Sequence, residues 1–215
     1  MKLPTPTRAL GMGIALAICA PATVSAAMLL TPGGPAGAMP ASLGSGPGGG
    51  SVVFYSSAPT PDTPPPGNFT AQLDSAVTKG NTFGGNALTF WYRIMNVDQT
   101  PNGAAIFSLG VPLPGSASVY LDQLSGSGNL SGLAMNTGGS ISFYWTTNPV
   151  MENQISAWQS IETPFSNWVL KSVGVIAGTS EDVAALIPAV PEPSTYAGIF
   201  ALGLAGFAAY RRLRG

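Results

Sequence analysis

The feature that most constrains this chain is a series of short alternating apolar stretches, each closed by a turn sequence, between Asn68 and Ala189. In ALTFWYRI, residues 87–94, every second side chain is apolar and would face one side of a strand, with Thr89, Trp91 and Arg93 on the other. Turn sequences such as DQTPNG separate it from the stretches GAAIFSLGV, ASVYLDQL, GSISFYWTT, NQISAWQSI, NWVLKSVGVI and DVAALIP. About seven short strands at this spacing predict an all-β domain over residues 68–189, an antiparallel β-sandwich of the immunoglobulin-like type.

We expect the alternating apolar side chains to supply the core of this sandwich. Ile106 and Phe107 are adjacent, and strict alternation lets only one of them point inward, but a bulge or a covered outer face would admit both. The predicted core residues are Leu88, Phe90, Tyr92, Ile94, Ile106, Phe107, Val119, Leu121, Ile141, Phe143, Trp145, Val169, Val173 and Val175. Further along, TSED at residues 179–182 has the pattern of a weak capping box, which predicts at most a single helical turn before Pro188.

Composition excludes several kinds of chemistry. The 215 residues include 28 Gly and 20 Pro, which argue against a helical bundle, but no His and a single Cys, Cys19. His-based catalysis, Ser-His-Asp and Cys-His nucleophiles, and zinc sites built on His or Cys are thereby excluded. Between residues 27 and 190 there are only three basic residues against eight acidic ones, so the clustered basic surface of a nucleic-acid-binding protein is absent. We expect no cofactor, no metal and no nucleic-acid partner.

Carboxylates are the remaining candidates for catalysis, because a glycosidase needs two of them within roughly 5–10 Å. Glu152 and Glu162 flank the stretch NQISAWQSI and could line a sugar cleft with Trp158. The simpler interpretation is that both are solvated turn residues, and we expect no catalytic residue. About two of the four Trp residues should belong to the core of a sandwich.

The N-terminal segment, residues 1–26, has the three parts of a secretory signal peptide. Two basic residues precede an apolar run at 9–20, and the small-residue sequence VSA predicts cleavage after Ala26. A retained membrane anchor is the alternative, although twelve apolar residues are too few to span a bilayer. A lipoprotein signal ending at Cys19 is a second alternative, but Ile18 departs from the small residue that normally precedes such a cysteine.

Residues 27–67 follow the predicted signal peptide and are dominated by Gly, Pro, Ser, Ala and Thr, including GSGPGGGS and PTPDTPPPG. This composition predicts a flexible-to-extended arm with little packing. The stretch SVVFYSS at residues 51–57 interrupts it with β-branched and aromatic residues, and we expect it to add a strand to the domain.

The C-terminal segment, residues 190–215, begins with VPEPST and ends with a group of arginines. Pro191 and Pro193 hold the backbone extended, and Ser194 can cap the helix that follows. We predict a single transmembrane helix at about residues 195–210, which carries no charge; its ~24 Å length falls short of a ~30 Å hydrocarbon core, so local thinning and snorkelling arginines would be needed. The arginines should stay cytoplasmic.

This order of residues resembles the PEP-CTERM sorting signal of Gram-negative bacteria. The resemblance implies recognition by exosortase, an integral membrane enzyme that would cleave near Pro-Glu-Pro, and an association with exopolysaccharide. The layout of the middle domain is also similar to that of domains often seen before such tails. The residues that match the signal and would act as elements of an enzyme's substrate are Pro191, Glu192, Pro193, Arg211, Arg212 and Arg214.

Together these features predict a secreted, non-enzymatic protein of the cell surface or extracellular matrix, sorted by exosortase in association with exopolysaccharide. The precursor would be membrane-anchored, with its C-terminus cytoplasmic. The alternative is a carbohydrate-binding or carbohydrate-processing module of the envelope, in which exposed Trp residues stack on sugar rings.

Overall fold

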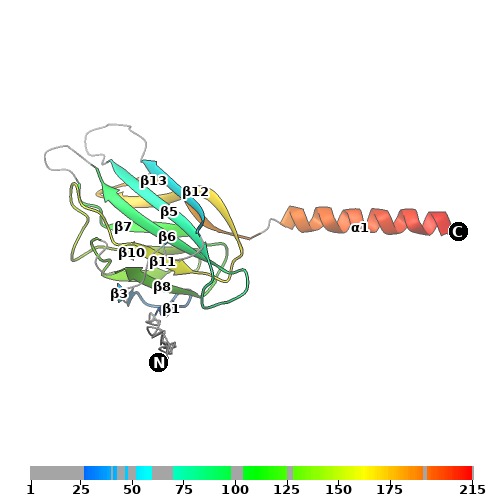
Figure 1. The fold of residues 1–215 in the computed structure, drawn as a ribbon, viewed down its shortest axis with the longest axis horizontal. Coiled ribbons are helices and arrows are strands. Elements are labelled where there is room, and N and C mark those ends of the chain that lie inside the picture. Colours follow the sequence, from blue (N-terminus) through cyan, green and yellow to red (C-terminus); the bar gives the residue numbers. More distant parts are fainter. Residues whose placement is uncertain are drawn as a thin grey trace, which may run out of the picture.

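The protein was analysed as a computed structural model, which describes residues 27–39, 41–42, 47, 52–59, 70–97, 104–124, 128–190 and 193–214. The predicted signal peptide, with its cleavage position at Ala26, lies outside the described residues. Two β-sheets face each other, and a single helix leaves them at the C-terminal end (Figure 1).

Near the centre of sheet 1 is β6, the strand with the clearest alternation of apolar and polar residues in the sequence. Its strand order is β1 (Met28–Leu30), β8 (Val119–Leu124), β11 (Gln159–Glu162), β6 (Leu88–Asn96), β5 (Ala71–Lys79) and β4 (Val52–Pro59), with β3 (Ala41–Ser42) also pairing with β8. The β3–β8 pair is parallel and the other pairs of this sheet are antiparallel.

Sheet 2 is wholly antiparallel among the described pairs. Its strand order is β13 (Thr179–Ala189), β12 (Asn167–Ala177), β7 (Ser108–Pro112), β10 (Ser140–Tyr144), β9 (Leu133–Asn136) and β2 (Gly37–Ala38). The prediction of a mostly antiparallel, all-β sandwich is therefore confirmed, while the immunoglobulin-like type stays a prediction.

The core lies between the two sheets and follows the alternation read from the sequence. Phe90 of β6 lies opposite Val77 of β5 and Ile161 of β11 in the ladder, and all three side chains are buried on the inner face of sheet 1. Twelve of the fourteen predicted core residues are buried: Leu88, Phe90, Tyr92, Ile94, Ile106, Val119, Leu121, Ile141, Phe143, Trp145, Val173 and Val175.

The other two predicted core residues, Phe107 and Val169, are exposed, at 43% and 44% of their surface. Ile106 takes the inward position, so alternation turns Phe107 outward, where it is only partly covered. Val169 lies on the same face of β12 as the buried Val173, but near the start of the strand its side chain stays exposed. The outcome for Phe107 follows strict alternation, whereas the exposure of Val169 depends on packing that no local pattern records.

The predicted helical turn at residues 179–182 is also wrong, because β13 begins there. Thr179 pairs with Ala177, and the ladder between β12 and β13 continues without interruption to the pair Asn167–Ala189. Gly178, with φ of +83°, forms the reversal between the two strands, a conformation that suits Gly. Eleven ladder pairs outweigh the weak local preference for a capped turn.

The described part of residues 27–67 packs against the sheets more than its composition predicted. They contribute β1, β2, β3 and β4, and the side chains of Leu30 and Met39 are buried. Two buried amides hold the segment: Asn136 Nδ2 donates to the carbonyl of Leu30 at 3.3 Å, and Gln123 Nε2 to that of Met39 at 3.1 Å. The strand expected in SVVFYSS is confirmed as β4.

The helix α1 spans Pro193–Arg214, which confirms a helix in the region of residues 195–210. The prediction that Pro193 stays extended and that Ser194 caps the helix is wrong, because both residues already belong to its first turn. Proline suits the first position of a helix because its missing N–H would have no partner there. None of the helices in the described part of the chain combines the length and the apolar character that crossing a membrane requires.

Candidate functional site

The sequence-predicted sorting residues lie on or beside α1. Pro193 is its first residue, Arg211 and Arg212 are exposed on its last turns, and Arg214 ends it. Pro191 and Glu192 lie outside the described residues. The structure therefore places the basic residues of the tail about 27 Å along a straight helix from the proline that opens it, at 1.5 Å per residue.

The helix exposes an apolar surface. Figure 1 shows α1 projecting away from the sandwich, and its described side chains are exposed. The large apolar ones among them are Phe200, Leu202, Leu204, Phe207 and Tyr210. An isolated helix of this character buries little apolar surface on its own domain, so the free energy available from covering it must come from another molecule or a lipid phase.

Only three residues, 190–192, separate the end of β13 from the start of α1. A chain of this length bridges at most about 14 Å between the Cα atoms of Ala189 and Pro193, whatever its path. The strand before it is firmly held: Pro188 and Ile187 are buried, and the ladder with β12 continues to Ala189. The tail therefore starts at the edge of a rigid domain, without a long linker.

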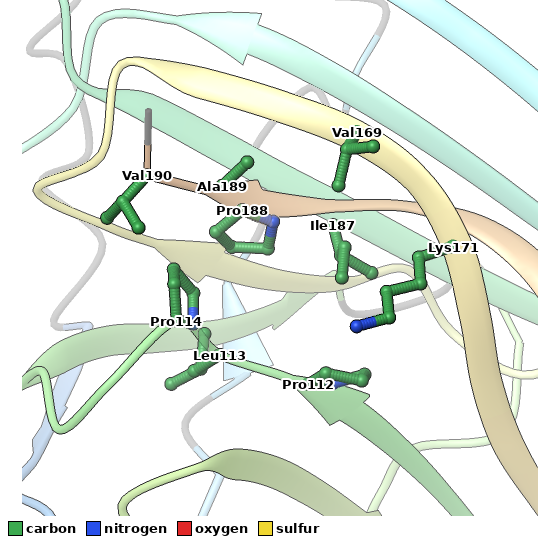
Figure 2. Close-up of a pocket in the computed structure, with 9 residues that line it drawn as sticks. All are labelled: Pro112, Leu113, Pro114, Val169, Lys171, Ile187, Pro188, Ala189 and Val190. Carbon is green, nitrogen blue, oxygen red and sulfur yellow. The ribbon is translucent and has the colours of Figure 1, made fainter. Parts of the chain in front are cut away.

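An apolar groove of about 360 Å³ lies at this exit point. Figure 2 shows side chains from the end of β7 and the following loop facing side chains from β12 and β13. Lys171 contributes the charged group. The lining residues are Pro112, Leu113, Pro114, Val169, Lys171, Ile187, Pro188, Ala189 and Val190. The sequence did not predict this groove. One of its lining residues, Val169, was predicted to be in the core but is exposed.

The two glutamates considered for a sugar cleft are not brought together. Glu162 pairs with Thr89 at the start of β6, whereas Glu152 lies in a turn whose next residue, Asn153, donates its N–H to the carbonyl of Asn96 at the other end of β6. Seven residues of strand separate Thr89 from Asn96, about 23 Å. Because a glycosidase pair must lie within roughly 10 Å, these carboxylates do not form one.

Trp145 belongs to the core, Trp168 of β12 packs against it, and Trp91 and Trp158 lie on the outer side of sheet 1. Trp145 is fully buried, and Trp158 is almost fully buried. The guanidinium carbon of Arg93 lies 4.6 Å from the ring centroid of Trp158, and Arg93 Nη2 forms an ion pair with Asp74 at 2.6 Å. The stacking surface of Trp158 is therefore occupied by a cation of the same sheet.

No group of three or more Asp, Glu, Cys or His residues that could hold a metal ion occurs among the residues with described positions. Glu162, at the tail-side end of sheet 1, accepts a hydrogen bond from the main-chain N–H of Thr82 at 2.9 Å. Beside it, the rings of Phe83 and Tyr120 lie 5.3 Å apart in a tilted arrangement. These contacts hold the loop between β5 and β6 against the sheet.

Comparison with protein families identifies the PEP-CTERM protein-sorting motif at residues 189–212. The match begins on the last residue of β13 and covers nearly all of α1. The resemblance noted from the sequence is thereby confirmed: the chain carries a PEP-CTERM motif, which implies an exported surface protein targeted to exosortase. Neither the curated proteins nor the solved structures contain a match to this chain.

Proposed function

We propose that this chain, which carries a PEP-CTERM sorting motif, is a non-enzymatic protein of the cell surface or extracellular matrix that works in association with exopolysaccharide. The observation that carries the proposal is the position of the motif. It starts where a rigid β-sandwich ends and continues into a helix whose apolar side chains are exposed. The sandwich is the part delivered, and the tail is the part recognised.

In the precursor, we propose that α1 anchors the protein in the membrane with its C-terminus cytoplasmic. Residues 196–210 carry no charge, and Arg211, Arg212 and Arg214 follow at once. The uncharged stretch measures only about 22 Å, so insertion requires local thinning of the bilayer and arginine side chains that reach the interface. Tyr196 and Tyr210 at its two ends suit the two interfaces.

The absence of an enzymatic role is supported by two observations. The chain contains no His, and the two glutamates considered for a sugar cleft lie beside positions of β6 that are about 23 Å apart. Carbohydrate binding is the alternative role for the sandwich. Trp91 favours it, because this ring is only half-buried on the outer face of sheet 1 and its Nε1 is held by Thr78 Oγ1 at 3.0 Å. The test is co-sedimentation of the protein with host polysaccharide. Binding that is lost in Trp91→Ala and kept in Phe107→Ala would establish carbohydrate binding.

Location of the protein in its native host tests the sorting role. Deletion of residues 191–215 should release the protein or retain it in the periplasm, since the address is lost. Glu192→Gln removes one carboxylate from the motif, and Glu181→Gln removes one from β13 as a matched control. We expect Glu192→Gln to accumulate as a membrane-bound precursor and Glu181→Gln to behave as the wild type. An unchanged location after the deletion would refute the proposal.

Intact-mass spectrometry tests the processing that accompanies sorting. The mature protein should begin at Ala27 and lack most residues after Pro193. In a host without exosortase, the form that retains residues 194–215 should persist. A mature species that keeps α1 in the native host would mean that the helix is a permanent anchor.

A further inference from the structure

We propose that the end of the sandwich from which the tail leaves is a membrane-facing surface that rests on an anionic lipid interface, an inference that depends on the proposed anchoring of α1. This tail-side end comprises the loops 80–87, 113–118 and 163–166 and the adjoining end of the β12–β13 hairpin. Three observations carry the inference: the short connection to α1, the distribution of charge along the sandwich, and the apolar groove.

The short connection restricts where the domain can lie. Ala189 and Pro193 are at most about 14 Å apart, and one further turn of helix reaches the start of the uncharged stretch at Tyr196. If that stretch is in the bilayer, the end of β13 lies at most about 20 Å from the hydrocarbon boundary, of which about 5–8 Å is the headgroup region. The folded domain is therefore held close to the interface.

The register shows which charged residues lie at that end. Lys171 lines the groove and pairs with Ala185, just on the tail side of the middle of β13. The loop 113–118 joins β7 of sheet 2 to the start of β8 in sheet 1 at the same end. In sheet 1 the start of β8 lies beside the end of β11, which lies beside the start of β6. Leu88 at the start of β6 pairs with Lys79 at the end of β5, so Lys79 also lies at this end. Both lysines are exposed. The three loops of the tail-side end contain no charged residue.

The opposite end is acidic. Glu181 and Asp182 lie beside the reversal at Gly178, and the exposed Glu152 lies in the turn next to Asn96. At the tail-side end the nearest described carboxylate is that of Glu162, which is engaged by the N–H of Thr82. Exposed lysines at one end and exposed carboxylates at the other orient the sandwich with its lysines toward a negatively charged surface.

Exposed apolar side chains complete the surface. Val169 and Val190 line the groove, and Leu170, on the other face of β12, and Phe83 are exposed elsewhere at the tail-side end. Apolar side chains such as Met151 and Ile176 are exposed at the other end too, so apolar exposure does not choose between the ends. The short connection to α1 and the distribution of charge do choose between the ends. They assign the groove to lipid headgroups and upper acyl chains.

Site-specific fluorescence in reconstituted vesicles tests the inference on the full chain. With Cys19 replaced by Ser, single cysteines at Leu170, Ile176 or Phe207 carry an environment-sensitive NBD label. Leu170 and Ile176 are a matched pair: they share one strand and one face, are 53% and 46% exposed, and lie about 20 Å apart. The N-terminal segment is identical in all three proteins, so its contribution cancels. Equal melting temperatures confirm that the substitutions leave the fold intact.

In vesicles of phosphatidylglycerol and phosphatidylcholine with brominated acyl chains, we expect strong quenching at Phe207, clear quenching and a blue shift at Leu170, and neither at Ile176. Absence of quenching at Phe207 would show that the tail does not insert, and would remove the proposed anchoring. Quenching at Phe207 without any at Leu170 would overturn the membrane-facing surface while leaving the anchoring intact, and would make a protein partner the occupant of the groove.

A comparison of anionic and neutral vesicles tests the contribution of the two lysines. Quenching at Leu170 should be stronger in vesicles that contain phosphatidylglycerol than in pure phosphatidylcholine. The double variant Lys79→Glu, Lys171→Glu should lower it to the level of the neutral vesicles, with quenching at Phe207 unchanged. Equal quenching at Leu170 in both lipids and in both proteins would contradict the assignment of an anionic lipid surface.

Discussion

Tyr92 and Leu186 belong to opposite sheets and share a hydrogen bond: the phenolic Oη of Tyr92 donates to the main-chain carbonyl of Leu186 at 2.6 Å. On the same residue, the main-chain N–H of Leu186 donates to Ser75 Oγ at 3.1 Å. β13 is an edge strand of sheet 2, and these two groups point away from its partner β12. Side chains of sheet 1 therefore satisfy the free edge of the strand that leads into the tail.

Replacement of Tyr92 by Phe should destabilise the sandwich by about 1–3 kcal/mol, because the buried carbonyl of Leu186 loses its partner and the ring keeps its packing. Urea denaturation followed by tryptophan fluorescence measures the change. Tyr120→Phe is the matched control, since this tyrosine is partly exposed on the outer face of sheet 1, and it should alter stability by less than about 0.5 kcal/mol. Equal effects of the two substitutions would show that the hydrogen bond to Leu186 contributes nothing.

Burial raises the pKa of Tyr92 well above its usual value of about 10. The folded state thus keeps the phenol neutral at a pH where the unfolded chain ionises it. The stability that depends on this group is complete below about pH 10 and falls above it, by about 1.4 kcal/mol per pH unit. Denaturation at pH 8, 10 and 11 should show a steeper loss for the wild type than for Tyr92→Phe. Parallel pH profiles of the two proteins would contradict the raised pKa.

Phe143 and Phe107 provide a test of the core. Phe143 is fully buried between the sheets, so Phe143→Ala should cost about 3–5 kcal/mol from lost burial and the cavity left behind. Phe107, the adjacent-pair residue that the sequence wrongly assigned to the core, is exposed, and Phe107→Ala should cost about 1 kcal/mol or less. Thermal unfolding of both variants checks the difference, and similar melting temperatures would refute the assignment of the two faces.

Asn136 tests whether the segment after the signal peptide is part of the fold. Its Nδ2 donates to the carbonyls of Leu30 and Ala117, at 3.3 and 2.8 Å, and its Oδ1 accepts from the N–H of Gly138. Asn136→Ala leaves these groups without partners and should cost about 2–3 kcal/mol. Hydrogen exchange in β1 should accelerate along with the loss of stability. The exposed Asn167 serves as the control, and unchanged protection of β1 in Asn136→Ala would contradict its role.

Much of the sandwich could be predicted from local pattern because burial of one face imposes a period of two on the sequence. β6 illustrates this, since each of its four predicted inward side chains is buried. β5 escaped prediction for a physical reason. Its inward positions are Ala71, Leu73, Ser75 and Val77, and the polar Ser75 that breaks the apolar alternation is the residue that accepts the N–H of Leu186. Ser75 interrupts the apolar pattern of β5 because its hydroxyl group is needed by a residue of the opposite sheet.

The sorting motif at the C-terminus was readable from sequence alone, because its Pro-Glu-Pro, its uncharged stretch and its terminal arginines are neighbours in the chain. The surface of the sandwich next to the sorting motif depends on contacts between residues far apart in the chain. Lys79 and Lys171 lie 92 positions apart, and only the ladder registers bring them to one end of the sandwich. Val169 matched a core pattern, yet its exposed side chain lines an open groove. Alternation specifies which face a side chain takes, whereas the layer above it determines whether that face is covered.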